Sequence, residues 1–204
     1  MTIFGVTGSI LLPECVAKTG QSGCWDSVGN PISCGGTGQD GEYQKGCSPA
    51  VAPSSGYSFG GYNRTSFKCS GGFTDNGNGT VTDNLTGLIW LKNANCFGAL
   101  TWANALSAAN TLNSGECSLT DCSVEGDWRL PNLNELRSLF DPGLSAPYLP
   151  AGHPFTGVKS DYYWSSTTRA YDESFAWGVN LYDGYMGSVH KSDTGYVWPV
   201  RGGQ

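Results

Sequence analysis

Cysteine is the residue type in this chain whose number and spacing offer the clearest chemistry. The 204 residues contain eight cysteines, an even number spread through loop-like sequence, which favours disulfides. The alternative is zinc, whose thiolate ligands usually lie about two to four residues apart with histidines nearby. Only Cys117 and Cys122 come near that spacing, and neither His153 nor His190 lies beside them in the sequence. We therefore predict a disulfide framework and no metal site.

The disulfide pairing is a hypothesis, because eight cysteines allow about 105 connectivities. Closure between cysteines near in sequence favours Cys24–Cys34, Cys47–Cys69 and Cys96–Cys117, which leaves Cys15 for Cys122. The last pair would tie the N-terminal segment to the rest of the chain. Frameworks of this kind are typical of proteins that fold outside the reducing cytoplasm. The sequence thus predicts an extracellular or cell-surface protein.

The other chemistry-bearing residues form no catalytic motif. Neither His-Glu-x-x-His nor Gly-x-Ser-x-Gly occurs, and His153 is in a Gly-His-Pro segment typical of a packing histidine in a loop. Residues 75–83 lack the alternating acidic ligands and the closing glutamate of a calcium loop. We therefore expect a binding protein with no cofactor, and not an enzyme.

Charge and hydropathy exclude other classes of partner. The net charge is −6, and the 11 Lys and Arg residues are scattered singly, so a nucleic-acid partner is not expected. No apolar run approaches the roughly 20 residues that span a bilayer. Residues 1–12 are apolar but lack the basic start of a signal peptide, so we expect any export signal to lie outside this numbering.

The elements that must position a binding surface begin after residue 72. Residues 1–72 carry five of the eight cysteines and little periodicity, which predicts a cysteine-rich, irregular N-terminal arm. Residues 73–204 form the predicted domain. Asn-Gly steps within residues 73–83 predict a hairpin, and residues 88–91 read as a strand.

Two helices are predicted in the middle of the chain. The first begins at Thr101, the expected N-cap, and its buried face is listed here: Trp102, Ala105, Leu106, Ala109 and Leu112. The second spans about residues 132–140, where Asn132 and Glu135 have the spacing of a capping box. Both helices are interpreted as scaffold.

The last third of the sequence alternates strands and turns. Strands are predicted at residues 162–168, 175–181, 185–190 and 196–201. Asp183-Gly184 offers a two-residue hairpin turn, and Pro199 favours an edge position or a bulge for the final strand. Two helices packed on an antiparallel sheet make this an α+β fold.

Four segments, in order, resemble the Lcl C-terminal domain family. They are FTDNGNGTVTDNLTGLIW at 73–90, GDWRLPN at 126–132 followed by Glu135-Leu136, YWSSTT at 163–168 and YVWPVRG at 196–202. The family is a bacterial domain with a C-type-lectin-like fold, named for the end of a collagen-like adhesin. The resemblance covers about residues 73–202.

This resemblance implies a surface-attached or secreted module that recognises glycans or proteins. Members of the fold also serve as the variable proteins of diversity-generating retroelements, so a diversified receptor is one form that this function takes. The exposed-looking residues of the C-terminal strands are the candidate ligand-binding residues: Arg169, Tyr171, Asp172, Glu173, Tyr182, Asp183, Tyr185, Met186, His190 and Asp193. Tyrosine and aspartate supply amphipathic contact area and hydrogen bonds at modest entropic cost. For any single residue, an ordinary polar hairpin surface is the alternative.

Calcium-dependent sugar binding and filament assembly are two further functions to weigh. The tripeptide through which C-type lectins hold sugar by calcium is not present, because Leu130-Pro131-Asn132 lacks its carboxylate. Asn132 is better explained as a helix cap. The competing function is structural: a subunit of an extracellular filament or coat, or another homo-oligomer, assembled through an apolar strand at residues 2–12.

Overall fold

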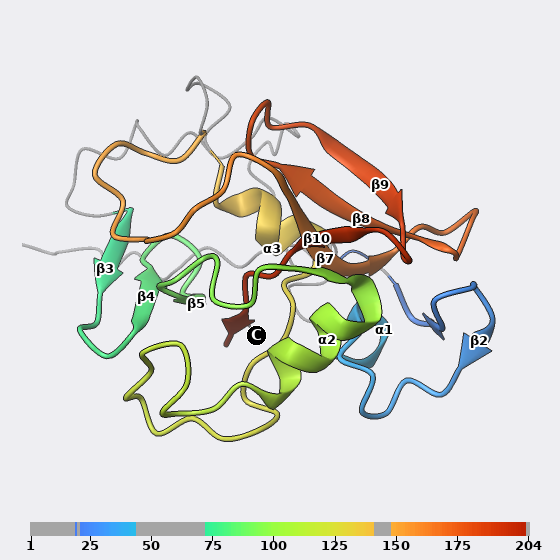
Figure 1. The fold of residues 1–204 in the computed structure, drawn as a ribbon, viewed down its shortest axis with the longest axis horizontal. Coiled ribbons are helices and arrows are strands. Elements are labelled where there is room, and N and C mark those ends of the chain that lie inside the picture. Colours follow the sequence, from blue (N-terminus) through green and yellow to red (C-terminus); the bar gives the residue numbers. More distant parts are fainter. Residues whose placement is uncertain (1–18, 20, 44–71, 141–147, 203–204) are drawn as a thin grey trace, which may run out of the picture.

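The computed structural model describes residues 19, 21–43, 72–140 and 148–202 (Figure 1). The predicted strand at residues 2–12, on which the filament alternative depends, lies outside the described residues. So do Cys15 and both members of the predicted Cys47–Cys69 pair. These predictions stay predictions.

The larger of the two main sheets has five strands. In spatial order they are β6 (Ala99–Thr101), β10 (Thr194–Tyr196), β7 (Tyr162–Thr168), β8 (Phe175–Asn180) and β9 (Met186–His190). Neighbouring strands are antiparallel except β10 and β7, which run parallel where Tyr196 lies opposite Tyr163. Met186 and His190 are the first and last residues of β9, and the other candidate binding residues lie in the loops that follow β7, β8 and β9.

A second sheet of four strands lies beside the first (Figure 1). Its order is β11 (Val200–Arg201), β5 (Ile89–Leu91), β4 (Thr80–Asp83) and β3 (Phe73–Asp75). The predicted hairpin at 73–83 is confirmed as β3 and β4, joined by residues 76–79.

The closing segment corrects the sequence prediction of one continuous strand at residues 196–201. The chain leaves β10 at Tyr196 and joins the other sheet as β11 at Val200, so the segment links the two sheets. Pro199 lies between them and cannot donate a ladder hydrogen bond, while its carbonyl accepts one from Leu91 N at 3.0 Å. The prediction of a single antiparallel sheet was wrong too, because this segment links two separate sheets. β11 is an edge strand, as the proline predicted.

The second predicted helix is confirmed with its cap. Helix α3 (Leu133–Ser138) begins after Asn132, whose side chain accepts a hydrogen bond from Glu135 N, while the Glu135 carboxylate accepts from Asn132 N at 2.8 Å. This reciprocal capping box satisfies two amide groups at the helix start. The helix is shorter than predicted and packs on β7 and β8.

Helix α2 (Trp102–Thr111) forms where the periodicity predicted it. Trp102, Leu106 and the small residues between its turns are buried. Thr101 is the N-cap residue, as predicted, although its side chain makes no capping hydrogen bond. Instead, the first amide of the helix donates to Lys191 O at 3.2 Å.

Aromatic side chains fill the core between the sheets. Trp198 lies in edge-to-face contact with Trp90 from β5 and Phe155 from a loop, and it also contacts Tyr163 from β7. Its indole N–H donates to Leu91 O at 2.9 Å. A second cluster joins Trp102 of α2 to the opposite face of the five-stranded sheet. The sheet is therefore covered on both faces, with α2 on one and α3 on the other.

The described part of the N-terminal arm is more regular than predicted. It holds the two-stranded hairpin of β1 (Cys24–Trp25) and β2 (Pro31–Ile32) and the short helix α1 (Asp40–Tyr43). Whether residues 1–72 and 73–204 form separate units stays a prediction.

Two predicted disulfides are confirmed. Cys24 is bonded to Cys34 in the arm, and Cys96 is bonded to Cys117 beside the aromatic core between the two main sheets. Cys122 is exposed and has no disulfide partner within the part of the chain that the structure describes. The predicted Cys15–Cys122 pair stays untested, because Cys15 lies outside that part.

A buried ion pair lies at the meeting point of these elements. The Arg129 guanidinium contacts both oxygens of Glu135 at 2.7 Å, and the side chains are 6% and 1% exposed. Arg129 also donates to Gly202 O at 3.1 Å, and its backbone pairs with Val200. One guanidinium therefore connects the start of α3 to the end of the chain.

We predict that Arg129→Met lowers the free energy of unfolding by about 3–5 kcal/mol, because it leaves the Glu135 carboxylate buried without its partner. Urea unfolding measures the loss. Replacing both residues with methionine is expected to cost less than Arg129→Met alone. Lys92→Met is the matched control: it removes the solvent-exposed pair with Asp75 and is expected to cost much less, because water screens exposed ion pairs. Equal losses for the two single variants would contradict the assignment.

Candidate functional site

The ten predicted binding residues lie at two ends of the β8–β9 hairpin (Figure 1). The first group, on the β7–β8 loop and at the end of β9, contains Arg169, Tyr171, Asp172, Glu173, His190 and, one turn later, Asp193. The second group, at the β8–β9 turn, contains Tyr182, Asp183, Tyr185 and Met186. The strands between them are about 17 Å long at the usual rise per residue. The structure therefore places the residues in two patches, one at each end of the β8–β9 hairpin.

The first patch is organised around Arg169. Its guanidinium lies 3.8 Å from the ring centroid of Tyr171 and 5.1 Å from that of Phe175. It also donates to the Ser188 hydroxyl of β9 at 3.1 Å. A cation over an aromatic face is attractive, so Arg169 fixes the orientation of Tyr171. Tyr171 is 78% exposed, which makes it a preorganised contact surface.

Phe175 extends this patch across the hairpin. It lies directly opposite His190 in the β8–β9 register, and the two rings meet edge to face at 5.2 Å. The sequence interpretation did not select Phe175 or Ser188 as site residues. Their contribution depends on the strand register, and the only sequence signal was the alternation of residue types along residues 175–181.

The acidic residues of the first loop shape the loop itself. The Asp172 carboxylate accepts hydrogen bonds from the Ser174 hydroxyl at 2.6 Å and from Ser174 N at 3.3 Å. These bonds lower the pKa of Asp172, with a smaller contribution from the nearby charges of Arg169 and His190. The Asp172 charge is therefore already directed at its own turn.

The second patch corrects the predicted two-residue turn at Asp183-Gly184. Asn180 and Tyr185 form the last backbone pair of the hairpin, so four residues connect them. The longer loop has a packing reason, because Leu181 is fully buried and must turn inward to the core. Gly184, at φ +69°, then allows the chain to return.

Tyrosines dominate this second patch. Tyr182 and Tyr185 are each 66% exposed. Asn180 accepts a hydrogen bond from Tyr182 N, and Asp183 accepts one from Tyr185 N at 3.0 Å, which fixes the loop backbone. The two rings therefore project from an ordered turn.

Two glycines lie opposite each other in the strands beside this turn. Gly178 and Gly187 face each other across β8 and β9. A Cβ atom at Gly178 would lie 2.6 Å from the Tyr162 ring, and one at Gly187 would lie 2.7 Å from the Tyr185 ring. Because both glycines lack a side chain, the Tyr162 hydroxyl reaches across the sheet to donate to Gly187 O at 2.6 Å. Burial raises the pKa of Tyr162 above its usual value, so this hydroxyl keeps its proton.

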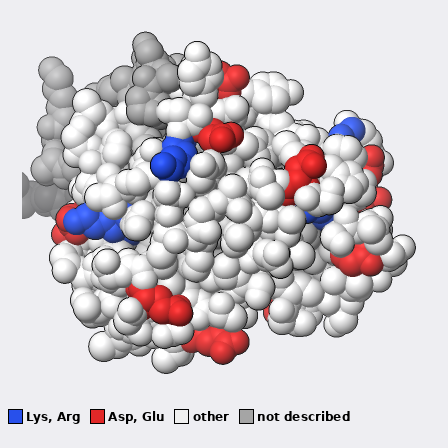
Figure 2. Space-filling model, in the orientation of Figure 1, with Lys and Arg blue, Asp and Glu red and all other residues white. Residues whose placement is uncertain are grey.

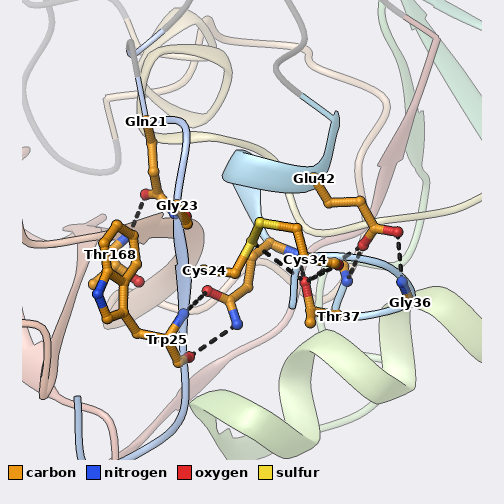
Figure 3. The surroundings of a disulfide bond; sticks show 11 residues. Gln21, Gly23, Cys24, Trp25, Cys34, Gly36, Thr37, Glu42 and Thr168 are labelled. Carbon is orange, nitrogen blue, oxygen red and sulfur yellow. Dashed lines mark hydrogen bonds between the residues drawn. A yellow bond between two sulfur atoms is a disulfide. The ribbon is translucent and has the colours of Figure 1, made fainter. Parts of the chain in front are cut away.

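The N-terminal arm contacts β7 close to the first patch. The second half of β7, which β10 does not pair, is covered by side chains: Gln21 accepts a hydrogen bond from Thr168 N at 2.6 Å (Figure 3). The Trp102 indole donates to Ser165 O at 2.8 Å. These contacts satisfy backbone N–H and C=O groups of β7 that would otherwise lack partners. The arm and α2 therefore take the place of a neighbouring strand along this part of β7.

The disulfide keeps this part of the arm in shape (Figure 3). Next to the Cys24–Cys34 bond, the Glu42 carboxylate accepts hydrogen bonds from Gly36 N at 2.6 Å and Gly38 N at 2.8 Å. The turn is thus closed both covalently and by a charge-assisted pair of hydrogen bonds.

Asp40 is a buried carboxyl within the contact between the arm and β7. It is 3% exposed and accepts hydrogen bonds from the hydroxyls of Thr19 and Thr167. Burial raises its pKa, and the nearby Glu135 charge raises it further, while the hydroxyls and Arg129 act in the opposite direction. Folding therefore shifts the Asp40 equilibrium towards the protonated form relative to the unfolded chain.

Among the described residues, no group of His, Cys, Asp and Glu is arranged to hold a metal ion. In the same part of the chain, no helix is long and apolar enough to cross a membrane. His153 packs beside Phe155, and burial lowers its pKa.

The face in Figure 2 carries its charged side chains as separate small groups on a largely uncharged surface. A cleft of about 530 Å³ lies between the β1–β2 hairpin and α2. Its lining includes Ile32, Leu106 and the acidic Asp26 and Glu125. None of the predicted binding residues lines it.

The fold and the exposed hairpin define a disulfide-stapled α+β domain with an aromatic surface. The sequence profile of the Lcl C-terminal domain family matches residues 79–201, more than half of the chain. The chain belongs to this family, as the four motifs indicated. No curated protein matches it significantly. Family membership and the two disulfides are consistent with a surface-associated domain in an oxidising compartment.

We predict that Asp40→Asn removes part of the acid-side pH dependence of stability. Because the folded-state pKa of Asp40 is raised, its stabilising contribution is complete below the pKa of the unfolded chain and is lost as pH rises through the folded-state value. Urea unfolding between about pH 3 and 7 should show the wild type gaining stability relative to Asp40→Asn as pH falls.

Asp75→Asn is the matched control, since hydrogen bonding from Lys92 lowers the pKa of that exposed carboxylate. The wild type should lose stability relative to Asp75→Asn as pH falls. Parallel profiles for wild type and Asp40→Asn would contradict the role of Asp40.

Proposed function

We propose that this chain is an extracellular recognition domain that binds glycans or proteins through the β8–β9 hairpin and the β7–β8 loop. The observation that carries the proposal is the Arg169–Tyr171 stack, in which an exposed ring is held at 3.8 Å by a guanidinium that a neighbouring strand anchors. Exposed, preorganised aromatic side chains contribute contact area with little loss of conformational entropy on binding. The proposal includes binding without catalysis and export from the cytoplasm.

The arrangement of the two patches supports an extended ligand. Tyr171 lies at one end of the hairpin, and Tyr182 and Tyr185 lie at the other, about 17 Å away along the strands. Met186, the last residue of the second patch, is 37% exposed and begins β9. A glycan of several residues or a protein surface spans this distance, whereas a single small molecule contacts only one patch. The C-type-lectin-like character of the fold and the diversified-receptor form belong to this same proposal.

We predict that Tyr171→Ala and Tyr185→Ala each weaken binding about tenfold or more, as expected for exposed aromatic anchors. A glycan array and a pull-down against cell-surface proteins identify the ligand with the wild-type domain, and titration then measures each variant. Val124→Ala is the matched control, because Val124 is 63% exposed but lies outside the hairpin. Wild-type silence in both screens, with a well-folded sample, would contradict the proposal.

Arg169→Lys separates positioning from charge. Lysine keeps the positive charge but lacks the planar group that stacks on Tyr171 and reaches Ser188. We expect Arg169→Lys to weaken binding nearly as much as Tyr171→Ala. Full retention of affinity would show that Tyr171 needs no preorganisation.

A further inference from the structure

Lys191 follows β9 directly and is completely buried, with 0% of its side chain exposed. Lysine is rarely buried to this extent, because taking an ammonium group out of water costs free energy unless the charge is paired. The predicted binding residues include its neighbour His190 but not Lys191. The groups around the amine therefore determine how much its burial costs.

Three parts of the molecule meet at Lys191. Its backbone N–H donates to Ser174 O of the β7–β8 loop at 2.9 Å, and its carbonyl accepts from Trp102 N at the start of α2. Its Nζ donates to Asp26 O of the arm at 3.2 Å and lies 4.0 Å from the Trp102 ring centroid. One residue thus connects the arm, the binding loop and α2.

The ammonium group has no ionic partner here. No carboxylate oxygen of the described residues lies within 4.0 Å of Nζ. The Asp26 carboxylate is engaged by Val28 N and by the backbone and side chain of Asn30. Burial lowers the pKa of Lys191 to about 8, although the charges of Asp26 and Glu173 oppose this shift.

The charged groups that face Lys191 come from two elements. Asp26 belongs to the β1–β2 hairpin and Glu173 to the β7–β8 loop. Helix α2 contains no charged residue, and the preceding residue on β9 is His190. The negative charges and the Trp102 ring are therefore near enough to moderate the cost of the buried ammonium but do not cancel it.

The arm hairpin lies directly against the binding loop at this point. Gly29 has φ +90°, and a Cβ atom there would lie 3.0 Å from Ser174 N and 3.2 Å from the Glu173 carbonyl carbon. The Asp26 carbonyl also accepts a hydrogen bond from Gly29 N at 3.2 Å. Removing the Lys191 amine therefore leaves that carbonyl with a partner.

We propose that Lys191 makes docking of the arm hairpin against the β7–β8 loop depend on pH, because protonation of its buried amine weakens this contact. When the hairpin opens, water reaches the amine and the charged form becomes favourable. Below about pH 8, both states are protonated and the docked state carries the whole cost of a buried charge. As pH rises from about 8 towards 10.5, the docked state loses its proton first, so docking strengthens.

This inference concerns the folded chain alone and does not depend on the proposed ligand. It makes the arm a part of the surface that carries Arg169 and Tyr171, with a docking equilibrium that responds to pH. The arm would hold the loop more firmly in alkaline than in neutral solution.

The test is millisecond hydrogen exchange of the segment 26–30 between pH 6.5 and 9.5, corrected for the intrinsic exchange rate at each pH. In the wild type, we expect protection to rise at least tenfold as pH increases through about 8. The amides of α3 serve as the internal reference. A flat wild-type profile would overturn the proposal without any variant.

Two variants sharpen the test. Lys191→Met has similar length and no charge, and its protection at pH 7 should match or exceed the wild-type value at high pH and should not change with pH. Lys191→Arg remains charged throughout, so its protection should stay low and flat over this range. Loss of protection in Lys191→Met at every pH, with the α3 amides unchanged, would show that the amine stabilises docking and would overturn the proposal.

Discussion

The bidentate pair between Arg129 and Glu135 is the interaction on which most of the structure depends. Glu135 caps the start of α3 while it accepts both hydrogen bonds from Arg129, and Arg129 also binds the backbone near the end of the chain. Burial raises the cost of separating these charges, so α3 and β11 are fixed together. The hairpin that carries the candidate binding residues rests on α3 and on β7, and it inherits this rigidity.

The second constraint is the incomplete pairing of β7. Beyond Tyr163, β10 no longer continues alongside β7, and its edge is satisfied by the arm and by the indole of Trp102. The disulfide and Glu42 give the arm a fixed shape, so it presents its polar groups to that edge without a long strand of its own. Yet the same contact buries two ionisable groups, Asp40 and Lys191. Because burying these two groups costs desolvation free energy, the stability of this contact depends on their protonation and therefore on pH.

The features that sequence predicted well are those decided by neighbouring residues. The Asn132–Glu135 capping box and the Cys24–Cys34 bond both depend on short-range spacing, and both are present. The turn after β8 was predicted wrongly because Leu181 is drawn into the core by partners distant in sequence. In the same way, the register that places His190 opposite Phe175 and the complete burial of Lys191 depend on tertiary packing, which residue type alone does not reveal.

We propose that binding belongs to the cysteine-free hairpin and its preceding loop, while the disulfides and the ion pair support them. Chemical-shift mapping by NMR, with the glycan or protein captured by the wild-type domain, tests this most directly. The account predicts that the largest shifts on binding fall in residues 169–175 and 182–190. Shifts confined to the cleft between the β1–β2 hairpin and α2, with the tyrosines of the β8–β9 hairpin unchanged, would contradict it.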